Sequence, residues 1–257
     1  SDLMDQRDLA LDELSRLASV SASLDSHGAM LVSIGGVMVA GNGTSVMLQS
    51  SIVGGVLKVT TSGGQEVPML GGEVGSALEL YNTTIPGYMS QLDDLANAII
   101  ARVNAVHSAG YGLGNPPQTG INFFTGSGAA GIAVNVQISS DLNNIAASST
   151  GQPGDNQNAL ALFGISNERL MGGGTLTVSQ YYGNFVSALG AAVSGAQSSG
   201  SGAELVLAQL SAQRESVSGV SLDEEMTNMI KFQRAFEAAA RVISTSDELI
   251  QTILTMV

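Results

Sequence analysis

The C-terminal stretch from Ser221 to Val257 reads SLDEEMTNMIKFQRAFEAAARVISTSDELIQTILTMV. From Leu222 onward its residues at alternating intervals of four and three are apolar, with only Gln233 and Asp247 as polar members. Such a repeat, sustained over about five heptads, is typical of a coiled-coil helix. Ser221 with Glu224 three residues later forms a capping box, which predicts that the helix starts there.

A stripe of this kind needs a partner. Burying one large apolar side chain is worth about 1.5 to 3 kcal/mol, which an isolated helix in water cannot recover. We therefore expect this helix to pack against other helices and to be the assembly interface of the chain. The predicted contact residues are Leu222, Met226, Met229, Phe236, Ile243, Ile250 and Leu254.

Two further patterns precede this helix. Apolar residues at helical spacing predict an amphipathic helix over 2–20. From 21 to 79, short apolar runs separated by Gly-Gly, Gly-Asn-Gly and Ser-Gly-Gly predict antiparallel strands joined by hairpins. Helical spacing returns after Thr84, a predicted N-cap with Pro86 in the first turn, and should end at Gly110.

The segment from 110 to 156 is rich in Gly, Ser, Asn and Pro, and we expect loops with one strand over 132–138. Helices are predicted over 181–197 and 203–216, with the Ser/Gly stretch 198–202 interrupting or bending them.

The resulting fold class is α+β, an elongated helical body with an antiparallel β subdomain and a long C-terminal helix of the coiled-coil type. The expected division is 1–20 helix of the helical body, 21–83 β subdomain, 84–217 helical body with a loop and strand excursion at 111–156, and 218–257 C-terminal assembly helix.

Composition excludes several classes of partner. The 257 residues carry a net charge of -13 with 9 Lys plus Arg, which opposes binding to nucleic acid or to an anionic membrane surface. The absence of Cys excludes disulfides, thiolate nucleophiles and Cys-ligated metals. No apolar run approaches the roughly 20 residues that span a bilayer.

Candidate chemical sites are weak. Residues 126–131 match the spacing GxGxxG, but a β-like run follows where a dinucleotide site needs a helix, so a flexible connection is favoured. His27 and His107 lack metal-ligand spacing and are interpreted as surface or capping residues. Asp155 lies in an acidic, Asn-rich turn without the spacing of a calcium loop, so helix capping is favoured.

The acidic run 223–225 lies in the first turn of the terminal helix, where negative charge meets the positive end of the helix dipole. Capping is therefore favoured over a catalytic carboxylate pair, and we expect no catalytic, cofactor or metal site.

Three blocks of sequence resemble the flagellar hook-associated protein 1 family. They are Leu3–Asp8 with Leu11–Ser15, then Thr84–Tyr88 through His107 to Asn122–Phe124, and finally Ser218–Glu225 with Phe232, Gln233, Ala240 and Thr252–Leu254. The last block is the most specific. In that family the terminal helices pair as a coiled coil, so the resemblance implies a piece lacking an N-terminal helix that would precede Ser1. It also implies that the large outer β insertion of bigger members is absent here, since only 126–131 separates Phe124 from the predicted strand.

The resemblance further implies a structural subunit that is exported by the flagellar type III apparatus, lies outside the cell and joins hook to filament. The implied partners are copies of itself, the hook protein, the second hook-filament junction protein and an export chaperone, with no catalysis and no cofactor. Two alternatives stay open: another axial protein of the hook or distal rod type, or a secreted enzyme or binding module on a flagellar scaffold. The second is disfavoured because residues 21–83 hold Tyr81 as their only aromatic residue and scattered acids.

Overall fold

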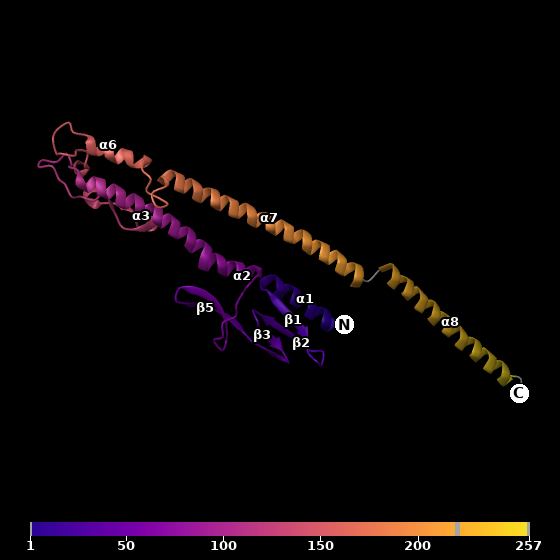
Figure 1. Cartoon of the computed structure of the whole chain (residues 1–257). Helices are drawn as coiled ribbons and strands as arrows, with labels where there is room; N and C mark the ends of the chain where they lie inside the picture. Colours follow the sequence, from indigo (N-terminus) through magenta and orange to yellow (C-terminus); the bar gives the residue numbers. More distant parts are fainter. Residues whose placement is uncertain (1, 219–221, 256–257) are drawn as a thin grey trace. The chain divides into compact units, whose positions relative to one another are not determined.

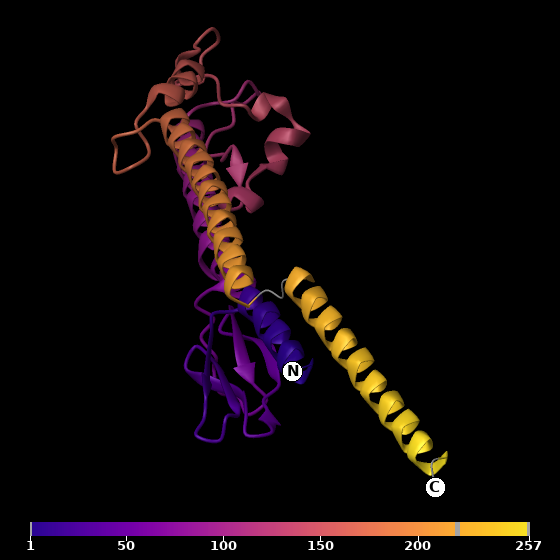
Figure 2. The same ribbon diagram turned by 90° about the vertical axis from the view of Figure 1, so that its right-hand side faces the viewer.

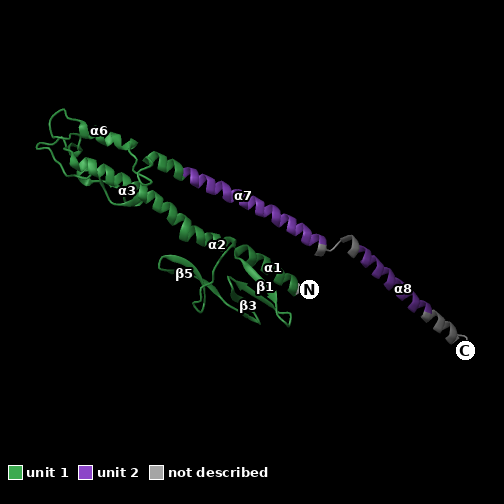
Figure 3. Cartoon of the chain, viewed as in Figure 1, with its two compact units in different colours: residues 1–185 green, residues 186–257 purple. Residues whose placement is uncertain are grey.

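The computed structural model describes residues 2–218 and 222–255, and the side chains within 217–225 and 246–257 are outside the description. The chain forms two compact units, Ser1–Phe185 and Val186–Val257 (Figures 1 and 3). The predicted α+β class is confirmed, since long helices accompany antiparallel sheets and the C-terminal helix is present.

The first unit opens with a helix and a β region. The elements are α1 (Asp2–Leu17), β1 (Val20–Leu24), β2 (Met30–Ile34), β3 (Val37–Gly41), β4 (Thr44–Ser45), β5 (Leu48–Val53) and β6 (Val56–Thr61). Strands β1 to β4 form one antiparallel sheet in chain order, and β5 pairs with β6. Two-residue turns close β2–β3 and β5–β6, and each contains two glycines at positive φ, as primed hairpin turns require. The predicted hairpin-connected strands are confirmed.

A small apolar core joins α1 to the sheets. Its buried members are Ala18, Ile34, Val39 and Val67, and the half-buried Leu14 of α1 packs against them. Figures 1 and 2 both show α1 lying along the strands. The amphipathic pattern of α1 is explained only in part, because the core covers Leu14 while Leu3 and Leu9 are exposed.

The next helical segment begins earlier than predicted. It runs through α2 (Gly72–Glu79), the π-helical turn η1 (Leu80–Thr84) and α3 (Ile85–Ala109), so the β region ends before residue 72 and not at 83. Thr84 has helical dihedral angles and no capping hydrogen bond, which makes its predicted role as N-cap wrong. Pro86 lacks an amide hydrogen and would clash in a regular helix, and the wider turn directly ahead of it accommodates the ring.

Gly72 shows why the helix can start so close to the β region. Its φ is +71°, and a Cβ at this position would lie 2.5 Å from the backbone nitrogen of Ala18. Only glycine allows the start of α2 to approach the end of α1 this closely. The paired glycines here resemble a turn signal, which is why helical spacing alone placed the boundary too late.

Short elements follow α3. They are β7 (Phe124–Thr125), α4 (Gly128–Gly131), β8 (Ala133–Val134), α5 (Val136–Ser140), η2 (Leu142–Asn144), α6 (Gln157–Gly164) and η3 (Ile165–Asn167). The predicted strand over 132–138 is only partly present, because Asn135 accepts a hydrogen bond from the amide of Gln137 and starts a helix. The position where bigger relatives were expected to insert a domain holds the single turn α4.

Two long helices complete the chain, α7 (Val178–Ser218) and α8 (Leu222–Thr255). The predicted interruption of α7 at 198–202 is wrong, since the helix is continuous through this stretch. A glycine inside a helix costs only about 1 kcal/mol relative to alanine, and the Ala- and Leu-containing flanks outweigh it.

Candidate assembly surface

Helix α8 carries the predicted assembly stripe. Four of the predicted contact residues have described side chains, and all are strongly exposed, with fractions of 56% for Met226, 67% for Met229, 77% for Phe236 and 65% for Ile243. Large apolar side chains are normally among the most buried in a folded chain. A helix face that leaves four of them in solvent is therefore typical of a surface that packs against another molecule or segment.

The remaining predicted residues are less completely described. Leu222, Ile250 and Leu254 lie within α8, and Glu224 lies in its first turn, but their side chains fall outside the description. Ser221, the predicted cap, lies outside the described residues altogether. Their roles as contacts and cap stay predictions.

The apolar face is wider than the strict heptad stripe. Phe232 is 76% exposed and follows Met229 by three residues, so it flanks the stripe, and Ile230 on the other flank is exposed as well. The heptad rule missed these positions because it selects only two residues in seven. In α7, exposed Leu205, Leu207 and Leu210 add apolar surface to the second unit.

A second group of residues lies on one face of α3. These residues bond to the segment 121–146, which we call the head of the first unit. The GxGxxG stretch at 126–131 contains α4, whose first amides are already occupied: the carboxylate of Asp93 accepts from Ala129 N (2.7 Å) and the amide oxygen of Asn97 accepts from Gly128 N (2.8 Å). A phosphate would need these same N–H groups. The predicted flexible connection is thus a capped helical turn, and it offers no free phosphate cradle.

Further along the same face, Asn104 exchanges two hydrogen bonds with the backbone of Phe124, at 2.9 and 2.8 Å. His107 is 1% exposed; its Nδ1 lies 2.7 Å from the carbonyl oxygen of Ile121, and its Nε2 accepts from Ala146 N at 3.0 Å. The interpretation of His107 as a surface or capping residue is wrong, because it is a buried structural group. The sequence signal for this buried role is a polar stripe on an otherwise apolar helix, formed by Asp93, Asn97, Asn104 and His107 at helical spacing.

Asp155 organises the turn ahead of α6. Its Oδ2 accepts hydrogen bonds from the hydroxyls of Ser148, Ser149 and Thr150 and from two of their amides, all between 2.8 and 2.9 Å. Its Oδ1 accepts from the amide of Gln157 at 3.0 Å. The bond from Gln157, followed by those from the hydroxyls, holds the pKa of Asp155 well below its usual range. The predicted capping turn is confirmed in part: Asp155 bonds the first amide of α6, while the N-cap residue Asn156 makes no side-chain capping bond.

We expect Asp155→Asn to lower the thermal unfolding temperature at about pH 7 and to lower it less in acid. The folded-state pKa of Asp155 is depressed, so the stabilisation is complete above the unfolded-state pKa of about 3.9, declines as the pH falls below that value and is lost only below the folded-state pKa. Thermal melts at about pH 7 and about pH 3 measure the difference. Asp94→Asn removes an exposed carboxylate of α3 and serves as the control. Equal effects of both substitutions at neutral pH would contradict the prediction.

Arg102 of α3 binds Glu168 through two parallel hydrogen bonds, at 2.5 Å from Nε and 2.8 Å from its second nitrogen. This pairing lowers the pKa of Glu168 and raises that of Arg102, against an opposing effect of burial. Both side chains are at least a third exposed, so solvent weakens the pair, and exposed ion pairs contribute only about 0.2 to 1 kcal/mol. It fastens the segment after η3 to α3.

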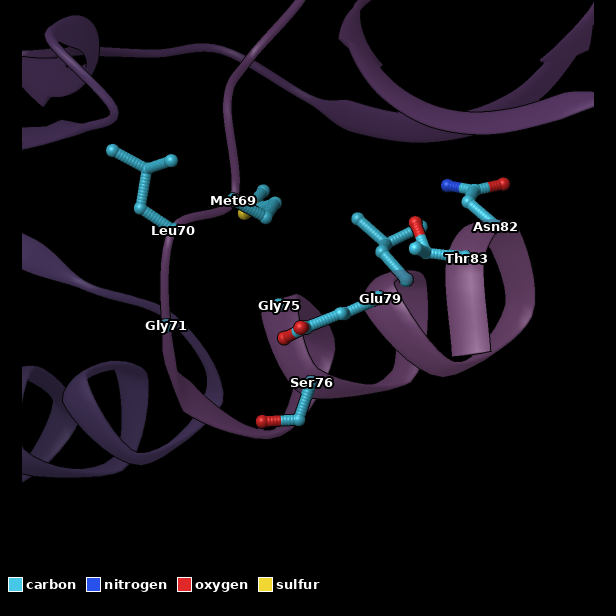
Figure 4. A pocket seen from close by; sticks show the side chains of 9 residues that line it. Met69, Leu70, Gly71, Gly75, Ser76, Glu79, Asn82 and Thr83 are labelled. Carbon is cyan, nitrogen blue, oxygen red and sulfur yellow. The ribbon is translucent and has the colours of Figure 1, made fainter. Parts of the chain in front are cut away.

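A hollow of about 350 Å³ lies beside α2 and η1 (Figure 4). Of its nine lining residues, Glu79 alone carries an ionisable side chain, and Asn82 uses both of its amide atoms on the backbone of Leu57, at 2.8 Å each. The hollow therefore holds no pair of titratable side chains of the kind that share general acid and base work.

Within residues 2–218 and 222–255, no group of three His, Asp or Glu side chains is arranged to hold a metal ion. No helix in those ranges combines the length and the apolar character of a membrane span.

Two family models and several curated relatives match parts of this chain. The family model described as flagellar hook-associated protein FlgK helical domain matches residues 1–124. Flagellar hook-associated protein 1 of Bacillus subtilis is 33% identical over 180 residues, which cover 66% of this chain and 35% of that protein. The chain is a FlgK-type protein. The FlgK proteins of Salmonella typhimurium and Escherichia coli are 36% and 32% identical over 100 residues, 39% of this chain and 18% of each relative.

The stripe-bearing helix has a match of its own. The family model described as flagellar basal body rod FlgEFG protein C-terminal matches residues 212–256, which contain α8. A FlgK-type chain thus has a terminal helix similar to that of rod-type proteins. The matched regions span only 35% and 18% of the lengths of these FlgK relatives, so the match describes a part of those proteins.

Proposed function

We propose that this chain is a structural subunit of the bacterial flagellum that forms the junction between hook and filament and polymerises through its terminal helices. The observation that carries the proposal is the exposed heptad stripe of α8 in a chain whose relatives are named flagellar hook-associated protein 1. A face of this kind gains stability only when another helix covers it. Assembly is therefore the role that the surface supports best.

The proposed partners are copies of the chain, the hook protein, the second hook-filament junction protein and, before export, a chaperone. Charge does not distinguish among these partners, since Lys231, Arg234 and Arg241 of α8 stand against six acidic residues of the same helix. The proposed location is outside the cell, after type III export, and the proposed role is not enzymatic.

A second candidate is an axial protein of the rod or hook type, and the FlgEFG match over 212–256 favours it. The terminal helix cannot separate the two classes, because both carry it. Similarity over residues 1–124 to the FlgK helical domain favours the junction role.

Deletion of the gene in the source bacterium tests the proposal. A junction subunit predicts complete hooks that lack filaments in electron micrographs, with filaments restored by the intact protein. Absence of hooks would indicate the rod or hook type, and normal filaments on the hooks would contradict both roles.

A further inference from the structure

Two methionines mark the described start of the assembly stripe. Met226 and Met229 are three residues apart on α8, so they share one face, and they are 56% and 67% exposed. Phe236 and Ile243 continue the same stripe. Both thioether groups therefore reach solvent at the surface where the helix is proposed to pack.

The chain contains ten methionines and no cysteine, so its thioethers are its most readily oxidised side chains. Hydrogen peroxide transfers one oxygen atom to a thioether: the sulfur attacks the peroxide, the O–O bond breaks, and water leaves. The sulfur loses two electrons and becomes a sulfoxide, while the peroxide is reduced to water. The reaction converts a flexible apolar side chain into a polar one.

We propose that Met226 and Met229 form a peroxide-sensitive modification site that blocks assembly when it is oxidised. The inference rests on the proposed function of α8. A sulfoxide oxygen buried among apolar residues lacks a hydrogen-bond donor, so covering the oxidised stripe with a partner helix becomes unfavourable. Once assembled, the same partner shields the thioethers, so the site acts on the unassembled chain.

The other methionines supply internal references. Met47 in the β region is 76% exposed and lies outside the stripe, whereas Met171 is 6% exposed. We expect peroxide to oxidise Met226, Met229 and Met47 at similar rates and Met171 much more slowly, because reaction follows exposure. Oxidation of Met47 alone should leave assembly unchanged, because Met47 lies outside the stripe.

The experiment combines peptide mass spectrometry with binding of the full-length protein to hooks isolated from cells that lack it. Protein is treated with hydrogen peroxide, and the amount that sediments with hooks is divided by that of the untreated sample. The wild-type ratio should fall by about tenfold, the effect of about 1.4 kcal/mol. Met47→Leu should show the same fall. The double variant Met226→Leu/Met229→Leu should show a ratio near one. Because each protein is compared with its own untreated sample, any effect of leucine on binding cancels.

Reduction by methionine sulfoxide reductases should restore wild-type binding, which separates this site from irreversible damage. If mass spectrometry shows sulfoxide at both positions while the wild-type ratio stays near one, the inference is wrong and the proposed function stands. An equal fall in the double leucine variant also overturns the inference. If untreated wild type does not bind hooks, the proposed function fails, and this inference fails with it.

Discussion

A chain carrying Phe236→Asp should fold normally in its first unit and yet fail to join hook to filament. Phe236 is 77% exposed on α8, so its replacement removes no core contact from residues 1–185. Covering the stripe with a partner would instead bury an unpaired carboxylate, which costs several kcal/mol in an apolar contact. The aromatic contribution of about 1.5 to 3 kcal/mol is lost as well. Ile243→Asp should act in the same way.

Electron microscopy and swimming assays of cells whose only copy carries the substitution measure the effect, while a thermal melt of the purified protein checks the fold. Ala238→Asp is the matched control, because it introduces the same residue two positions away, on the face opposite the stripe. We expect filaments on its hooks. Normal filaments in the Phe236→Asp and Ile243→Asp strains would refute the assembly role of the stripe, and failure of all three would assign the defect to added charge.

The features that sequence reasoning predicted are those encoded by neighbouring residues. The hairpins of β2–β3 and β5–β6 follow from paired glycines between apolar runs, and the stripe of α8 follows from a period of seven. Each signal lies within a short window of the chain. Local conformation and pattern agree there, so no distant contact is needed to decide the outcome.

What escaped prediction depends on residues far apart in the chain. The start of α2 requires Gly72 to meet the end of α1, and the polar face of α3 bonds to backbone groups 14 to 39 positions later, as Asn104 and His107 do. A polar residue in a helical pattern looks the same whether it faces solvent or a loop. Only the folded chain distinguishes a surface histidine from one that is 1% exposed.

The exposed apolar face of α8 was predicted by type and only partly by residue. The heptad selected Met226, Met229, Phe236 and Ile243, which are exposed, yet it passed over Phe232, which is as exposed as Phe236. A straight helix drifts relative to a repeat of seven, so residues beside the stripe extend the exposed apolar face. A list of heptad positions does not say how wide the apolar face is, because the width depends on which neighbouring side chains on the helix are also apolar.

His107→Ala should strongly destabilise the first unit. The substitution leaves the carbonyl of Ile121 and the buried amide of Ala146 without partners, at about 1 to 3 kcal/mol for each unsatisfied group. It also removes the ring that packs edge-on against Phe123 at a centroid distance of 5.3 Å, which leaves a cavity. The expected loss of about 3 to 5 kcal/mol is a large part of the roughly 5 to 15 kcal/mol that holds a typical domain together.

Urea unfolding measures this loss, and hydrogen exchange at Ala146 locates it, since that amide loses its acceptor. His27→Ala removes an 89% exposed side chain and should change stability by less than about 0.5 kcal/mol. His107→Asn places an amide near the position of Nδ1 and can keep the bond to Ile121, whereas His107→Gln reaches the position of Nε2 and can keep the bond from Ala146. Both should be less destabilised than His107→Ala, and slow exchange at Ala146 should survive only in His107→Gln. Unchanged stability of His107→Ala would show that the head of the unit does not depend on this ring.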